Sequence, residues 1–123
     1  YAVTALVRGA SASGEVRTTD YVLYFRYELE GGGGTGEALQ FRGDLEPRPG
    51  LDVLDIRLHL LDQRNVVLET HLLHMPGAFG GVSGTSVRQR FPVPPGAAFL
   101  AFSHYAHEDP RRILRDDDRR RRW

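Results

Sequence analysis

Apolar and polar residues alternate with a period of two along most of the chain, and turn-forming residues interrupt the alternation roughly every ten residues. The clearest stretch is Tyr21 to Glu30, in which every odd-numbered residue is aromatic or leucine. Successive side chains of a β-strand point to opposite faces, so we expect these odd-numbered residues to be buried. Arg26 and Glu28, which lie between them, should be exposed.

The same alternation predicts seven strands, whereas helical periodicity is hard to find. The strands are expected at Ala2 to Arg8, Tyr21 to Glu30, Ala38 to Leu45, Leu54 to Asp62, Val66 to Met75, Thr85 to Val93 and Ala97 to His107. We therefore predict an all-β domain over residues 1–107, an antiparallel seven-stranded β-sandwich of the immunoglobulin-like or a related kind. An Arg/Asp-rich C-terminal extension follows at residues 108–123. The strand spacing and the stretch Phe91 to Gly96 resemble those of many immunoglobulin-like sandwiches, which implies an architecture and not a function.

The best hairpin signal joins the fourth and fifth expected strands. Asn65 tolerates a positive φ, so a loop of residues 63–65 would close the hairpin and place Asp62 opposite Val66. That register puts Leu60 opposite Leu68 on the inward face. The outward face then carries Asp55, Arg57, His59 and Leu61, opposite Leu73, His71, Glu69 and Val67 in that order. This outer face is polar in its middle and apolar at both ends, which a fully solvated sheet would not need.

The C-terminal extension is, after the outer face of the hairpin, a second candidate for contact with another protein. It holds seven arginines against five acidic residues and ends in Trp123, a large aromatic side chain that is costly to expose. We therefore predict a protein–protein interface, with a partner protein or in a homo-oligomer, made of Arg57, His59, Leu61, Val67, Glu69, His71, Leu73, Arg119, Arg120, Arg121, Arg122 and Trp123. The function this favours is that of a non-catalytic structural or accessory subunit of an extracellular or periplasmic assembly.

The amino-acid composition excludes several kinds of site and partner. The chain has no cysteine, and all of its basic residues other than histidine are arginine, which excludes disulfides, thiolate metal sites and lysine-based catalysis. No apolar run approaches the roughly 20 residues that span a bilayer. The formal net charge is zero, and Asp116 to Asp118 offset the terminal arginines, so we expect no nucleic-acid partner. The sequence opens at Tyr1 without a leader, which favours a secreted, processed chain over a trimmed one.

Three other kinds of site are weaker candidates. His59 and His71 share a face in the predicted register, but only as diagonal neighbours, so we expect neither a metal nor a cofactor. A small hydrolase or a metal-binding domain stays a second alternative, because the chain supplies suitable residue types without any catalytic motif, namely Ser83, Ser86, Ser103, His104 and Asp109. The first alternative is a carbohydrate-binding module, in which Tyr24, Tyr105 and Trp123 are candidate stacking residues.

Overall fold

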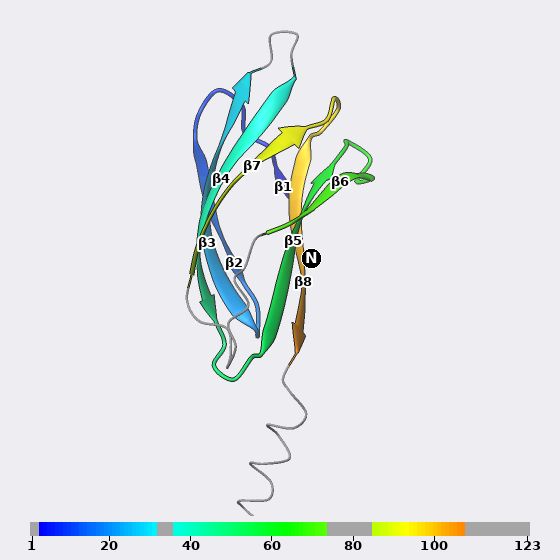
Figure 1. Cartoon of the computed structure of the whole chain (residues 1–123). Coiled ribbons are helices and arrows are strands. Elements are labelled where there is room, and N and C mark those ends of the chain that lie inside the picture. Colours follow the sequence, from blue (N-terminus) through cyan, green and yellow to red (C-terminus); the bar gives the residue numbers. More distant parts are fainter. Residues whose placement is uncertain (1–2, 32–35, 74–84, 108–123) are drawn as a thin grey trace, which may run out of the picture.

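Two four-stranded antiparallel sheets face each other in the computed structural model, which describes residues 3–31, 36–73 and 85–107 (Figure 1). The β5–β8 sheet has the order β1 (Val3–Ala5), β8 (Phe99–His107), β5 (Val53–Leu61), β6 (Val67–Leu72). The β3–β4 sheet has the order β2 (Ala12–Arg17), β3 (Tyr21–Gly31), β4 (Glu37–Pro47), β7 (Thr85–Val93). The described residues contain no helix, and the prediction of an all-β antiparallel sandwich is confirmed.

The core lies between the sheets and follows the alternation of the sequence. In β3, Tyr21, Leu23, Phe25 and Tyr27 are buried, and Leu29 is half-buried. Arg26 and Glu28 are exposed, as predicted. The inward residues of the other strands complete one cluster, which includes Leu39, Phe41, Leu45, Ile56, Leu58, Leu60, Phe91, Leu100 and Phe102. No polar or charged side chain is buried among the described residues, so the sandwich is stabilised mainly by apolar contact.

One strand was not predicted. The structure describes eight strands where the sequence pattern indicated seven, and the additional strand is β2. Its inward positions hold Ala12, Gly14 and Val16, too small to give a clear hydrophobic period. The ring of Phe25 fills the space above Gly14, where an added Cβ would lie 2.6 Å from the ring's Cζ atom. The predicted first strand is correspondingly shorter and covers only Val3–Ala5.

The turn of the β5–β6 hairpin forms as predicted. Asn65 has a φ of 63°, and the Asp62 N–H donates to the Val66 carbonyl at 2.9 Å. The register beyond the turn differs, because a bulge places Leu61 opposite Val67 but Leu60 opposite Glu69. The predicted pairing of Leu60 with Leu68 is therefore wrong by one residue. A slip of one residue moves every later side chain of the strand to the other face.

The bulge reverses three predicted orientations, those of Glu69, His71 and Leu73. Glu69 and His71 turn toward the opposite sheet, where the His71 ring stacks on Phe91 with 4.7 Å between ring centroids. Leu73 is 0% exposed and belongs to the core cluster, and its N–H donates to the Ile56 carbonyl at 2.8 Å. Leu61 keeps its predicted pairing with Val67 but is only 2% exposed, so the prediction that Leu61 and Leu73 expose apolar surface is wrong for both.

Candidate functional site

The exposed large apolar side chains are unevenly distributed between the two sheets. Nine are exposed among the described residues, and seven of these belong to the β5–β8 sheet or to its β5–β6 turn. These seven are Val3, Val53, Val66, Val67, Leu68, Leu72 and Tyr105. Of the other two, Val7 lies in the connection between β1 and β2, and Tyr24 belongs to the β3–β4 sheet. Concentrated exposed apolar surface of this kind marks interaction sites more often than scattered single residues do.

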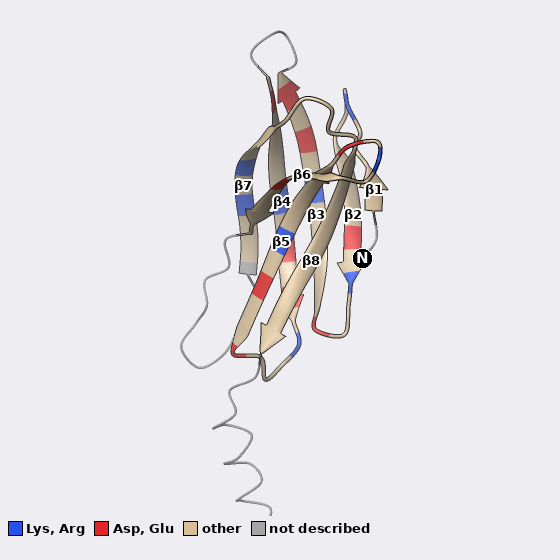
Figure 2. Cartoon of the chain, turned by 90° about the vertical axis from the view of Figure 1, so that its right-hand side faces the viewer, with Lys and Arg blue, Asp and Glu red and all other residues tan. Residues whose placement is uncertain are grey.

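Strand register shows that many of these residues share the outer face of the β5–β8 sheet. Tyr105 lies opposite Asp55, Leu72 lies opposite Arg57, and Val3 lies opposite Ala101. We name this surface the apolar face, defined by Val3, Val53, Val67, Leu72, Phe99 and Tyr105, with Asp55, Arg57, His59, Thr70 and Ser103 among them. Leu61 and Ala101 also occupy outward positions in this register, but they are only 2% and 0% exposed. Figure 2 shows β8 without a charged residue along its length and β5 with one basic and one acidic band.

A hydrogen-bonded group of three side chains crosses the middle of the apolar face. His59 Nδ1 lies 2.8 Å from Thr70 Oγ1 on β6, and His59 Nε2 lies 2.6 Å from Ser103 Oγ on β8. Burial lowers the pKa of His59, and the positive charge of Arg57 lowers it further. The neutral imidazole has one ring nitrogen that donates and one that accepts, so it can hydrogen-bond to both hydroxyls.

The contact between Ser103 and His59 contains two of the groups of a serine hydrolase. At the other ring nitrogen, however, the position that a triad gives to a carboxylate is occupied by the Thr70 hydroxyl. A hydroxyl carries no charge to stabilise the imidazolium that would form during catalysis. The geometry therefore favours a role in joining β6, β5 and β8 over a catalytic one.

A second histidine connects the two sheets. His104 Nε2 lies 2.9 Å from Asp20 Oδ2, and Arg48 approaches the other carboxylate oxygen at 3.4 Å. The hydrogen bond from His104 lowers the pKa of Asp20, an effect that Arg48 reinforces. Beside them, Tyr21 meets the His104 ring edge-on at 5.0 Å, and burial raises the pKa of Tyr21 to about 12. These contacts hold the β2–β3 connection to β8.

Metal binding gains no geometric support. The predicted common face of His59 and His71 is wrong, because the bulge turns His71 toward the opposite sheet. Across the described ranges there is no group of three or more histidine, aspartate or glutamate side chains placed to hold an ion. The same ranges contain no helix with the length and apolarity needed to cross a membrane.

Only part of the predicted interface lies on one surface. Arg57, His59 and Val67 lie on the apolar face as expected, while Glu69, His71 and Leu73 do not. Leu61 has the expected outward position but is buried. The predicted positions Arg119 to Trp123 lie outside the described residues, as does His74. Sequence reasoning did not include Val3, Val53, Leu72, Phe99 or Tyr105 in the interface. The signal for two of these, Phe99 and Tyr105, lay in the expected strand Ala97 to His107, which has apolar residues on both of its faces and corresponds to β8.

Comparison of the chain with protein-family models, with curated proteins and with solved structures found no match.

Proposed function

We propose that the domain is a non-catalytic structural or accessory subunit that assembles through its apolar face, and that the partner is a second copy of the same chain. The observation that carries this proposal is the location of seven of the nine exposed large apolar side chains in one sheet and its turn. The outer face of a sheet that remains in water normally carries polar residues at its outward positions. The apolar face departs from that rule along all four of its strands.

The charges on the apolar face support a second copy as the partner. Asp55 and Arg57 both point outward from β5, two residues apart, and no hydrogen bond or ion pair joins either to another described residue. In a two-fold dimer each surface patch meets its own copy, so residue pairs occur reciprocally. An axis passing between these two positions would bring Asp55 of each chain against Arg57 of the other. The face is therefore complementary to itself in charge as well as in polarity.

The size of the face suits a small dimer interface. Four strands about 4.8 Å apart are about 19 Å wide, and the nine residues of β5 extend for about 30 Å. Because β1 has only three residues and β6 has six, the flat footprint is about 430 Å², about half of the roughly 800 Å² that each partner buries in a standard interface. Side chains standing above the sheet increase the accessible area beyond the footprint.

The immunoglobulin-like classification belongs to the same proposal and is supported by the two facing antiparallel sheets. An extracellular or periplasmic location for the assembly likewise stays a proposal. The oligomerisation experiment described next depends on neither the fold classification nor the location.

Light scattering of the purified chain tests the proposal, and we expect a mass of twice 13.8 kDa at micromolar concentration. Leu72 is 52% exposed, so Leu72→Ser removes about half of a leucine side chain's burial energy from each copy. Two copies per dimer should weaken association about ten- to hundred-fold. Val7→Ser is the matched control, because Val7 is 41% exposed but lies outside the apolar face. A monomeric wild-type chain, or equal weakening by both variants, would refute the proposal.

A further inference from the structure

Three arginines lie side by side on the outer face of the other sheet. Arg26 of β3 is directly opposite Arg42 of β4, and Arg42 is directly opposite Arg88 of β7. Neighbouring strands are about 4.8 Å apart, so the three Cα atoms lie within about 10 Å of one another. All three side chains are exposed. We name this set the arginine row.

The fold does not account for the arginine row. Like charges directly opposite each other in a sheet destabilise it. Within the described part of the chain, none of the three guanidinium groups forms an ion pair or a hydrogen bond. The arginine row therefore holds three neighbouring positive charges that no described acidic side chain neutralises through an ion pair.

The nearby carboxylates mostly interact with other groups. Asp44 accepts a hydrogen bond from Ser86 Oγ at 2.8 Å, and Glu15 accepts one from Arg17 Nε at 2.9 Å. Glu30 accepts one from the Gln40 side-chain amide at 3.1 Å. These oxygens keep spare lone pairs and can accept further hydrogen bonds from hydroxyl groups of a ligand.

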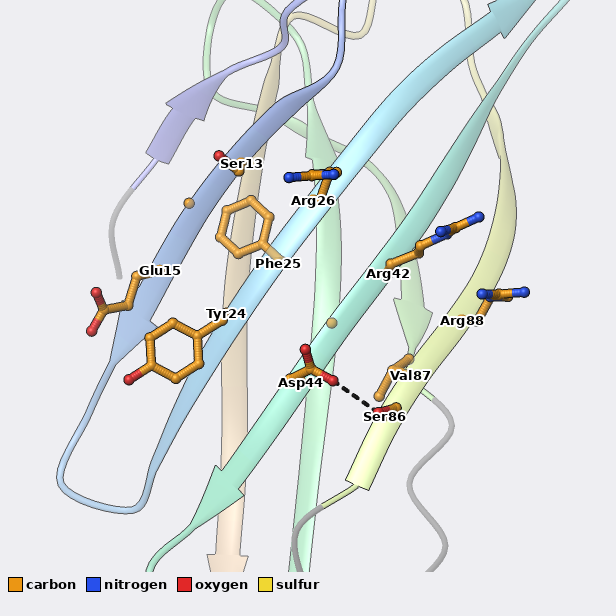
Figure 3. Close-up of a pocket in the computed structure, with 12 residues that line it drawn as sticks. Ser13, Glu15, Tyr24, Phe25, Arg26, Arg42, Asp44, Ser86, Val87 and Arg88 are labelled. Atoms are coloured by element: carbon orange, nitrogen blue, oxygen red, sulfur yellow. Dashed lines mark hydrogen bonds between the residues drawn. The ribbon is translucent and has the colours of Figure 1, made fainter.

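The arginine row lines a shallow hollow of about 680 Å³ (Figure 3). Tyr24 and Asp44 form the adjacent row across β3 and β4, directly opposite each other. Tyr24 is 41% exposed and is the one large exposed apolar side chain among the described residues of this sheet. The floor is low, because it is formed by the backbone of Gly14, Phe25, Gly43 and Val87, whose side-chain positions face the core. The hollow thus combines guanidinium groups, an aromatic ring, carboxylates and hydroxyls.

This combination fits an acidic sugar. Planar guanidinium groups bind carboxylate or sulfate oxygens in pairs of parallel hydrogen bonds. The face of a tyrosine ring packs on the apolar face of a sugar ring, while its hydroxyl stays in polar surroundings. Sugar hydroxyls can donate to Asp44 or to Ser86 Oγ, whose own proton is donated to Asp44, and they can accept from Ser13, which lines the same hollow.

A polyphosphate fits less well. Proteins that bind nucleic acid usually carry a domain-wide basic excess, with an isoelectric point above about 9. This chain has zero formal net charge and an isoelectric point of about 7.2. Glu15, Glu28 and Asp44 on the same face would also repel a continuous chain of phosphates. From these observations, we propose that the arginine row and Tyr24 form a binding site for an acidic oligosaccharide bearing carboxylate or sulfate groups.

Titration calorimetry at low ionic strength tests this site, with three sugar probes and one nucleic acid. The probes are a galacturonic-acid oligosaccharide, a sulfated oligosaccharide, a neutral glucose oligosaccharide of equal length and single-stranded DNA. We expect binding of one or both acidic sugars, which also identifies the preferred anion, and no binding of the neutral one. Arg42→Gln should weaken binding about ten-fold, as expected for loss of charge-assisted hydrogen bonds. Arg64→Gln in the β5–β6 turn is the matched control and should bind like wild type.

Four results would overturn the proposal: no binding of either acidic sugar, equal binding of the neutral sugar, tighter binding of DNA, or equal affinity of Arg42→Gln and wild type. Melting temperatures of the variants show that they remain folded, since exposed substitutions change stability little. The dimer mass of Arg42→Gln should equal that of wild type. Loss of sugar binding and failure of dimerisation are therefore separate results.

Discussion

Gly14 and Phe25 should show strong coupling in their effects on stability. Gly14 of β2 lies opposite Phe25 of β3, and an added Cβ at position 14 would meet the Phe25 ring at 2.6 Å. The ring cannot easily move, because it stacks on Tyr27 and Phe41 and packs at 5.2 Å between ring centroids against Phe102. The backbone at Gly14 itself has no positive φ, so alanine is allowed there by conformation.

The expected magnitudes follow from these contacts. Phe25→Ala should cost about 3–5 kcal/mol of unfolding free energy, because the side chain is 8% exposed and its removal leaves a cavity. Gly14→Ala should cost about 1–2 kcal/mol, the overpacking penalty less the gain from a more restricted unfolded chain. In the Phe25→Ala background the same substitution meets no ring and should be neutral, or stabilising by up to about 1 kcal/mol. The coupling energy of the cycle is then about 2 kcal/mol.

Urea denaturation of wild type, the two single variants and the double variant measures this coupling. The domain should tolerate the double variant, since small domains unfold with about 5–15 kcal/mol. Equal m-values across the set are required, so that midpoint shifts report stability alone. If Gly14→Ala costs the same in both backgrounds, the Phe25 ring does not determine the residue at position 14, and our explanation of β2 fails.

Three further predictions use the same denaturation assay. Leu73→Ser should destabilise the domain by several kcal/mol because Leu73 is in the core, whereas Leu72→Ser, one residue away, should change stability by less than about 1 kcal/mol; a larger effect of Leu72→Ser would support the hairpin faces inferred from sequence instead. Asn65→Ala should cost about 1 kcal/mol through its positive φ, and Asn65→Gly should cost less; equal costs would contradict the turn. Because the folded-state pKa of His59 is lowered, its contribution to stability is complete above its ordinary value of 6.5 and is lost as pH falls through the lower folded value. His59→Asn should therefore flatten the stability profile below about pH 6.5, and an unchanged slope would contradict this.

Much of the fold could be predicted from local pattern. β3 alternates because one face packs in the core and the other meets water, so burial is encoded at every second residue. The turn at Asn65 was predictable because few residues other than glycine adopt its φ of 63°. Both signals lie within a single stretch of chain. Neither requires knowledge of which strands become neighbours.

The missed features depend on contacts between strands. β2 was not predicted, because the apolar surface at Gly14 is supplied by Phe25 from the next strand. The bulge in β6 was not predicted, because residues 66–68 are all apolar and fit either register equally well. The bulge shifts the register by one residue, which places Leu73 in the core and turns Glu69 and His71 away from the predicted interface.

The arginine row could not be found from the sequence for a related reason. Arg26, Arg42 and Arg88 are far apart along the chain. β4 and β7 are neighbours in one sheet, but β5 and β6, which lie between them in the sequence, belong to the other sheet. The topology therefore produces a feature that no local spacing contains. It also places the arginine row and the apolar face on opposite outer surfaces, with the core between them. Sites separated by more than about 10 Å without shared partners usually act additively. A dimer formed through the apolar face would leave both arginine rows exposed, one on each side of the assembly, so two acidic sugars could bind a single dimer without competing with its interface.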